Sequence, residues 1–186
     1  MGTGIMICGL NGTGKSTLGR ALAEKLKFHF IDNEELYFSK TDSDYAYASS
    51  RTRKEAEELL HARVREHENF VYAAVKGDYG EDILSFYKYA VFIEVPEDIR
   101  LWRVKNRSFQ KFGSRIMPGG DLYEREKKFF DMVKARTEGD VRDWVRSLGC
   151  PVIGIDGTKP VEENVDAIVK WIRGEFQILD AGRNLW

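Results

Sequence analysis

Cysteine is scarce in this sequence, and its charges nearly cancel. The only cysteines among the 186 residues are Cys8 and Cys150, and neither sits in a paired motif. A disulfide framework is therefore not expected, and a reducing, cytoplasmic setting is predicted. The three histidines show no metal-ligand spacing with these cysteines. The formal net charge is −1, so no global field favours nucleic acid or an anionic membrane as a partner.

Long apolar runs are also missing. No stretch approaches the length that spans a bilayer. The apolar stretch nearest the N-terminus, residues 5–8, is only as long as a strand and follows no basic segment, so no signal peptide is expected. No internal repeat or low-complexity linker divides the chain. Its length is that of one domain, so residues 1–186 are predicted to form a single unit.

What the sequence does contain is an alternation of short apolar runs with longer segments of helical period. The apolar runs are residues 5–8, 28–31, 70–75, 90–95 and 152–155. The helical segments are residues 16–27, 51–67, 81–88, 98–107, 122–136, 141–148 and 161–173, with Asp98 placed as a cap and residues 108–121 as a loop. This alternation predicts an α/β domain with a mostly parallel sheet covered on both faces. Ligands of such sheets bind beyond the carboxyl ends of the strands.

The residues after the first apolar run form a phosphate-binding pattern. They read Gly-Leu-Asn-Gly-Thr-Gly-Lys-Ser-Thr, with four residues between the first glycine and Gly-Lys-Ser. Glycines let the backbone N–H groups wrap around phosphate oxygens at the start of a helix. Lys15 would reach the β- and γ-phosphates and the Ser16 hydroxyl would bind Mg²⁺, so the ligand is predicted to be ATP with Mg²⁺. The predicted binding residues are Gly9, Asn11, Gly12, Thr13, Gly14, Lys15, Ser16 and Thr17.

A chance glycine-rich turn is the alternative explanation of this pattern. The context argues against it, because a strand-like run precedes the loop and an amphipathic segment follows it, as a phosphate loop requires.

The chain resembles the P-loop kinases related to adenylate kinase, a group that includes nucleoside monophosphate, shikimate and gluconate kinases. The resemblance rests on the phosphate loop, on residues 92–96 followed by a helix with Arg103 and Arg107, and on residues 154–161. It spans about residues 4–172. It implies a three-layer α/β/α sandwich with a five-stranded parallel sheet in the order 2-3-1-4-5.

The same resemblance implies ATP-dependent phosphoryl transfer to a small-molecule acceptor. It places an acceptor-binding insertion at about residues 33–68 and a lid at about residues 107–122. It also places Lys159 and Pro160 in a loop beside the adenine.

The lid region is strongly basic for reasons independent of the resemblance. Residues 99–120 hold six Lys or Arg residues and no Asp or Glu. Arg100, Arg103 and Arg107 are spaced by three and four, so they are predicted to share one helix face. Guanidinium groups neutralise the charge of a transferring phosphoryl group, so Arg103 and Arg107 are predicted to act in catalysis, with Arg103 also binding the nucleotide. A solvated basic face is the alternative; weaker candidates for phosphate contact are Arg115, Arg125 and Arg136.

On the acceptor side, Asp32 follows the second apolar run and is predicted to be catalytic. A carboxylate suits a hydroxyl acceptor, which it can orient or deprotonate, or it can hold a water molecule on Mg²⁺. Its alternative role is to cap the next segment. Asp78 has two possible roles, either facing the metal or the acceptor or serving as a turn residue between two glycines. Lys76 is a candidate contact for an anionic acceptor.

The segment from residue 36 to residue 53 holds aromatic and basic side chains that leave two possibilities open. They would stack a base and grip a phosphate, which keeps a nucleotide acceptor possible, or they would pack against the core. The side chains concerned are Tyr37, Phe38, Tyr45, Tyr47, Arg51 and Arg53.

Two other functions compete with a small-molecule kinase. One is a nucleotide-dependent switch or ATPase that acts with a partner protein. The other is a kinase for nucleic-acid ends, to which the overall charge gives little support. The arginine-rich lid argues against the switch, because switches usually receive such arginines from their partners.

Overall fold

The computed structural model describes residues 2–38 and 50–175. The strands are β1 (Gly4–Cys8), β2 (His29–Asp32), β3 (Phe70–Ala73), β4 (Tyr87–Glu94) and β5 (Val152–Asp156). The helices are α1 (Lys15–Leu26), α2 (Asn33–Tyr37), α3 (Arg53–Glu66), α4 (Glu81–Leu84), α5 (Glu97–Phe112), the 3₁₀ helix η1 (Gly113–Ile116), α6 (Tyr123–Ala135), α7 (Glu138–Ser147) and α8 (Val161–Ile172).

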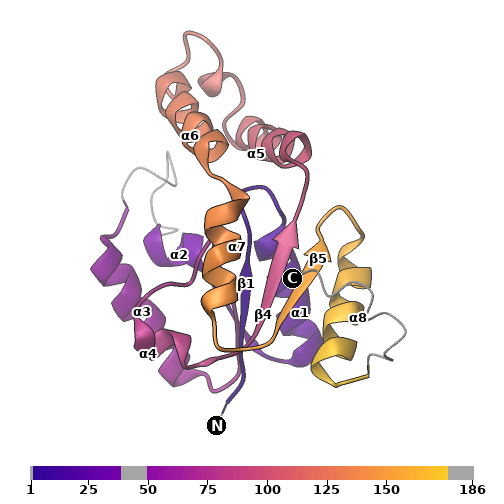
Figure 1. Cartoon of the computed structure of the whole chain (residues 1–186). Coiled ribbons are helices and arrows are strands. Elements are labelled where there is room, and N and C mark those ends of the chain that lie inside the picture. The colour runs from indigo at the N-terminus through magenta and orange to yellow at the C-terminus, as the bar shows by residue number, and fades with distance from the viewer. Residues whose placement is uncertain (1, 39–49, 176–186) are drawn as a thin grey trace.

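The strands form one sheet in the order β2-β3-β1-β4-β5, and every pairing is parallel. The predicted fold class and strand order are thereby confirmed. Helices lie on both sides of the sheet, with α1 and α8 on one side and α3 and α7 on the other (Figure 1). The strand β1 is central and all five of its residues are buried, as expected for a parallel sheet covered on both faces.

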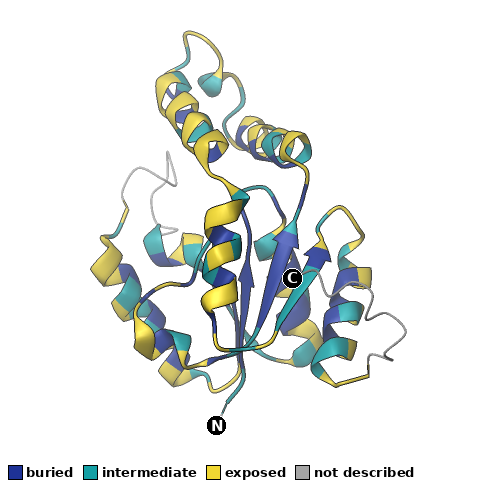
Figure 2. Ribbon diagram, viewed as in Figure 1, coloured by how far each residue is buried: buried dark blue, intermediate teal, exposed yellow. Residues whose placement is uncertain are grey.

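Alternate residues of the strands feed two separate cores, because successive side chains of a strand point to opposite faces. Ile5 and Ile7 pack with α1 and α8, whereas Met6 and Cys8 pack with the side that carries α3 and α7. Figure 2 shows the result, with buried strands between helices whose outer faces are exposed. Both cysteines are free thiols. No helix in the described ranges is long and apolar enough to span a membrane.

In the basic segment, the boundaries of α5 differ from the prediction, and the 3₁₀ helix η1 was not predicted. The N-cap of α5 is Pro96, and Asp98 lies in the first turn without a side-chain cap, so its prediction as the cap is wrong. Its carboxylate still favours the helix start through the helix dipole. The helix continues to Phe112 instead of ending near residue 107, because nothing before Gly113, at φ +58°, interrupts it. The predicted loop 108–121 therefore shrinks, and η1 occupies part of it.

One further helix is shorter than predicted, and another was not predicted at all. The helix α4 ends at Leu84, and residues predicted as its last turn begin β4 at Tyr87 instead. Tyr87 is buried and pairs with Gly4 of β1, so a long-range pairing overrides the local helical pattern. The short helix α2 was not predicted, because five residues are too few for a periodic signal.

The segment α5–η1–α6 projects beyond the carboxyl end of the sheet (Figure 1). It is called the arm below. Its tip is held by Arg115, whose Nη2 lies 2.6 Å from Asp121 Oδ2. The arm brings the predicted basic residues of α5 above the ends of β1 and β4, where a ligand of this fold class would sit.

At the opposite end of the sheet, the rings of His29 and His67 stack with centroids 3.6 Å apart. His29 Nε2 is buried without a hydrogen-bond partner among the described residues. Burial lowers the pKa of His29, the neighbouring His67 and Arg63 lower it further, and Glu66 opposes them. The folded protein therefore holds His29 in its neutral form.

We expect the protein to lose stability as the pH falls below about 6.5, the ordinary pKa of histidine. The unfolded chain takes up a proton at His29 before the folded chain does, so stability is complete above that pH and declines below it. Denaturant midpoints at pH 7.5 and pH 5.5 would measure the decline. His29→Gln should reduce it, whereas His61→Gln, outside the stack, should not; equal declines in all three proteins would contradict the assignment.

Candidate active site

The phosphate loop connects β1 to α1 at the carboxyl end of the sheet. Gly12 has a φ of +86°, and a Cβ there would lie 2.3 Å from the backbone oxygen of Arg100, so only glycine fits. Gly14, at φ +94°, is the N-cap of α1 and has open space around it. The first turn of α1 carries no acidic side chain. The helix therefore presents free N–H groups and a positive dipole end to an anion.

Lys15 is the first residue of α1, and its Nζ donates a hydrogen bond to the backbone oxygen of Leu10 at 2.8 Å. Burial, together with the positive charges of Arg107 and Arg136, lowers the pKa of Lys15 to about 8. Cys8 and Asp32 act in the opposite direction. These influences show that two guanidinium groups and one carboxylate lie near the Lys15 ammonium group. An anion with several negative charges would relieve this crowding of positive charge.

Arg136 contacts the phosphate loop directly. Its Nη1 donates to Asn11 Oδ1 at 2.6 Å, across 125 positions of sequence. The sequence ranked Arg136 below Arg103 and Arg107, because nothing in its local pattern indicates a contact with the loop. Only the return of α6 toward the sheet brings it there. Arg107 is exposed on α5.

Arg103 joins the phosphate loop to the loop after β5. Its Nη1 donates to the backbone oxygen of Gly157 at 3.1 Å and lies 3.5 Å from that of Gly12. Beside it is a cavity of about 270 Å³, whose walls include Thr17, Lys159 and Asn164. Pro160 is not among the lining residues and instead serves as the N-cap of α8. The structure thus brings Arg103 and Lys159, two residues predicted to bind the nucleotide, to one cavity next to the loop.

The donor set around Ser16 fits Mg²⁺ carried by a nucleotide. Ser16 is the second residue of α1, and Asp32 ends the strand β2 with 8% exposure. A hydroxyl and a nearby carboxylate are hard oxygen donors, as Mg²⁺ prefers. Within the described ranges, no group of three His, Cys, Asp or Glu side chains could hold a metal ion by itself. Phosphate oxygens would have to complete the coordination, as in other phosphate-loop sites.

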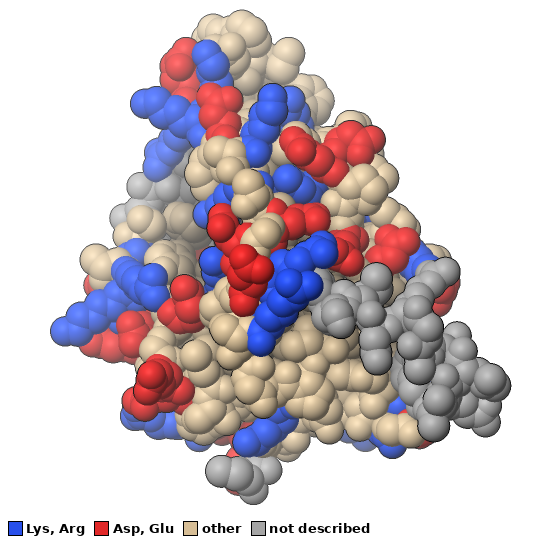
Figure 3. Space-filling view, viewed as in Figure 1, with Lys and Arg blue, Asp and Glu red and all other residues tan. Residues whose placement is uncertain are grey.

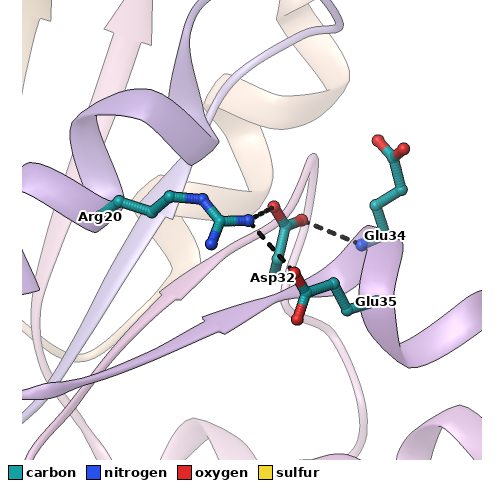
Figure 4. A network of polar contacts seen from close by, with 4 residues as sticks. All are labelled: Arg20, Asp32, Glu34 and Glu35. Carbon is teal, nitrogen blue, oxygen red and sulfur yellow. Dashed lines mark hydrogen bonds and ion pairs between the residues drawn. The ribbon is translucent and has the colours of Figure 1, made fainter. Parts of the chain in front are cut away.

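Asp32 is a cap and also a neighbour of the phosphate loop. Its Oδ1 accepts a hydrogen bond from the Glu34 backbone N–H at 3.0 Å and so caps α2. Its Oδ2 lies 3.5 Å from Arg20 Nη2, which also pairs with Glu35 Oε1 at 3.2 Å. Figure 4 shows the Arg20 guanidinium group pointing toward both carboxylates, with the Glu34 side chain pointing away. The cap therefore fixes the carboxylate in place, and the two proposed roles of Asp32 are compatible.

Next to Asp32, a cluster of phenols holds the side chain of Asn33. Asn33 Oδ1 accepts hydrogen bonds from Tyr72 at 2.6 Å and Tyr79 at 2.8 Å. Burial raises the pKa of both phenols, so they stay protonated and can donate. Tyr37 lies 3.2 Å from the Tyr79 oxygen. The aromatics described here thus form a polar wall, which sequence patterns did not indicate.

The remaining candidates are spread around this wall. Arg53 donates to the backbone oxygen of Asp78 at 2.6 Å and lies over the Tyr79 ring. Asp78 is exposed, and Lys76 is half-buried. Arg51 donates to the backbone oxygen of Leu36 at 2.9 Å. Tyr45 and Tyr47 lie outside the described residues.

The structure also places the other two weaker candidates for phosphate contact, Arg115 and Arg125, and the third arginine of the predicted helix face, Arg100. Arg115 is paired with Asp121 at the tip of the arm, and Arg125 is exposed on α6. Arg100 is 3% exposed. It was predicted to share a face with Arg103, but it lines a different cavity, so the expected common face is divided in two.

The family model described as an AAA domain matches residues 5–116, from β1 to the end of η1. Among curated proteins, an uncharacterized protein of Bacillus subtilis strain 168, YqaC, is 28% identical over 176 residues. That match covers 90% of this chain and 96% of YqaC.

Solved structures share the fold over nearly the whole chain. A shikimate kinase from Acinetobacter baumannii in complex with shikimate matches with a TM-score of 0.56 and 18% identity, covering 94% of this chain and 95% of that one. A shikimate kinase from Aquifex aeolicus matches with a TM-score of 0.51 and 22% identity, covering 93% and 98%. The chain therefore belongs to the AAA domain family, and it has the fold of the P-loop kinases.

Proposed function

We propose that the protein transfers the γ-phosphoryl group of ATP to a hydroxyl group of a small molecule. The observation that carries this proposal is the position of Asp32, a buried carboxylate held beside the phosphate loop and close enough to influence Lys15. A phosphate loop alone accounts for binding. A carboxylate next to it gives an acceptor hydroxyl a base or an orienting partner.

Some of the residues would bind ATP, and others would stabilise the phosphoryl group during its transfer. The N–H groups at the start of α1 and Lys15 would hold the β- and γ-phosphates. Arg107 and Arg136, which both act on Lys15 electrostatically, would offset the charge that spreads over the phosphoryl oxygens. Arg103 and the 270 Å³ cavity would take the base. Bound Mg²⁺ would bridge phosphate oxygens and neutralise charge, with Ser16 as its ligand.

The acceptor would lie against Asp32, Asn33 and Arg53. This wall offers a carboxylate, an amide and a guanidinium group. A hydroxyl-bearing acid would suit all three groups. The solved structures that share the fold include the shikimate kinase bound to shikimate and a gluconokinase from Sinorhizobium meliloti with a TM-score of 0.50 and 14% identity, covering 94% of this chain and 98% of that one. The substrates for which these two proteins are named support the same class of acceptor.

ADP release in the presence of single acceptors would test the proposal. Hydroxy acids and sugar acids form one panel, and nucleoside monophosphates form the second. We expect a member of the first panel to accelerate ADP release at least about tenfold over ATP alone and to yield a phosphorylated product. Acceleration only by nucleoside monophosphates would replace the hydroxyl acceptor with a nucleotide. Acceleration only by an added partner protein would overturn the kinase assignment.

A further inference from the structure

A second cavity, of about 610 Å³, lies where the arm joins the body of the protein. One wall comes from the end of β4 and the start of α5, and the other from the junction of α6 and α7. It is called the hinge cavity here, because both ends of the arm line it. It shares no lining residue with the 270 Å³ cavity beside Arg103. Its size is that of a small-metabolite site.

The hinge cavity is lined by a buried cation without a partner. Arg100 is 3% exposed, and its Nη1 has no hydrogen-bond partner among the described residues. No ion pair within the described ranges includes Arg100 either. A buried guanidinium group without a compensating charge is costly to keep, so its presence points to a ligand that supplies the missing partner.

Arg100 is accompanied in the cavity by two further cations that have no ion pair among the described residues. Lys134 and Arg136 also line it, and neither forms an ion pair with a described residue. Four carboxylates line it as well, and two of them are in ion pairs with a residue outside the lining. Glu94 and Glu138 both pair with Arg142. Asp156 accepts hydrogen bonds from the Thr158 backbone and hydroxyl.

Glu97 and Asp156 are the lining carboxylates with no ion pair in the described part of the chain. Three cations without an ion pair therefore face two carboxylates without one. Figure 3 shows this mixture, with acidic and basic side chains gathered over the middle of the face that α7 presents.

We propose that the hinge cavity binds a small metabolite through an oxyanion, either a carboxylate or a phosphate group, held by Arg100 together with Lys134 and Arg136. Guanidinium groups bind both kinds of oxyanion through paired hydrogen bonds. The cavity is large enough for an organic anion and not only for a bare ion. The cavity shares Arg136 with the phosphate site of the proposed kinase, but it has no lining residue in common with the 270 Å³ cavity, and oxyanion binding there does not depend on kinase activity.

Occupation of the hinge cavity would act on the phosphate loop through Arg136. The Arg136 side chain is exposed, and its guanidinium group donates to Asn11 Oδ1 at 2.6 Å while the residue also lines the cavity. An oxyanion in the cavity competes with Asn11 for it. The ligand also ties the start of α5 to the end of α6, the two ends of the arm. The site therefore regulates how the phosphate loop and the arm meet.

Arginine side-chain NMR on the full chain tests the site with malonate and inorganic phosphate as probes. The Nε–H signal of Arg100, identified by its loss in Arg100→Met, should move saturably with at least one probe. The probe that binds more tightly identifies the oxyanion class. The side-chain amide signal of Asn11 should move in parallel, because Arg136 is drawn from it. An Arg100 signal that neither probe moves, while amides of the phosphate loop respond, would overturn the site.

Anion affinity in matched variants gives an independent readout. Arg100→Met and Arg100→Gln should each weaken binding of the effective probe, as followed at the Asn11 amide, about tenfold. Lys105→Met removes an exposed cation of the same helix that does not line the cavity, and it should leave the affinity unchanged. Equal affinity in all of these proteins would overturn the proposal. Having both Met and Gln at position 100 keeps the test valid if one variant fails to fold.

Discussion

Lys15→Ala should lower ATP turnover about 10²- to 10³-fold or more, because the ammonium group balances charge on the transferring phosphoryl group. Lys15 lies at the start of α1, near Arg107 and Arg136, and its pKa of about 8 leaves it mainly protonated at neutral pH. Its loss removes the cation nearest the phosphates. Steady-state ADP formation with a saturating acceptor measures the effect.

The matched control for this variant is Lys25→Ala. Lys25 is on the same helix and pairs with Asp166 at 3.4 Å, and both of these side chains are more than half exposed. It should change turnover little and stability by a few tenths of a kcal/mol to about 1 kcal/mol. Turnover that survives Lys15→Ala at the level of Lys25→Ala would refute the phosphate-loop assignment.

Asp32→Asn should slow transfer to a hydroxyl acceptor about 10²- to 10⁴-fold, the usual contribution of a general base. Asparagine caps helices about as well as aspartate does, so α2 should keep its cap while the carboxylate charge is lost. The variant therefore separates the two roles that Asp32 can play. The expected signature is a lower kcat at an unchanged free energy of unfolding.

Asp32→Ala is the companion variant. It removes both the charge and the cap, so it should match Asp32→Asn in kcat and lose in addition about 1 kcal/mol of stability. Full activity in Asp32→Asn together with reduced stability in Asp32→Ala would show that capping is the sole role of Asp32. A modest loss of activity would instead favour an acceptor that is already ionised, such as a nucleoside monophosphate.

Local sequence patterns were enough to predict most of the strands and helices. Each apolar run became a strand, because a parallel strand buried on both faces has to be apolar along its length. The helix α3 is marked by a contiguous signal, in which Thr52 and Glu55 form a capping box. Predictions failed where a distant contact decided the outcome, as at Tyr87, which left a helical pattern to pair with β1. The prediction that Asp98 caps α5 failed for another reason, because the N-cap is Pro96, two residues earlier.

The candidate site also has one part that the sequence predicted and another that only the structure revealed. The phosphate loop was readable because all of its functional groups lie within nine consecutive residues, and its geometry depends on glycines at fixed positions. Three features required the tertiary structure: the contact of Arg136 with Asn11, the pairing of Arg20 with Asp32, and the burial of Arg100 in a separate cavity. None of these three features produces a recognisable pattern in the amino-acid sequence.

The phosphate loop and the strand before it could be predicted from local patterns, because both are encoded in adjacent residues. The tertiary structure decided which basic residues face that loop. Basic residues along a helix look alike in sequence, whereas packing sends Arg103 to the loop after β5 and Arg100 into the hinge cavity. The difference arises because α5 lies against the phosphate loop, with the Arg100 backbone in contact with Gly12, and only the folded chain contains that contact.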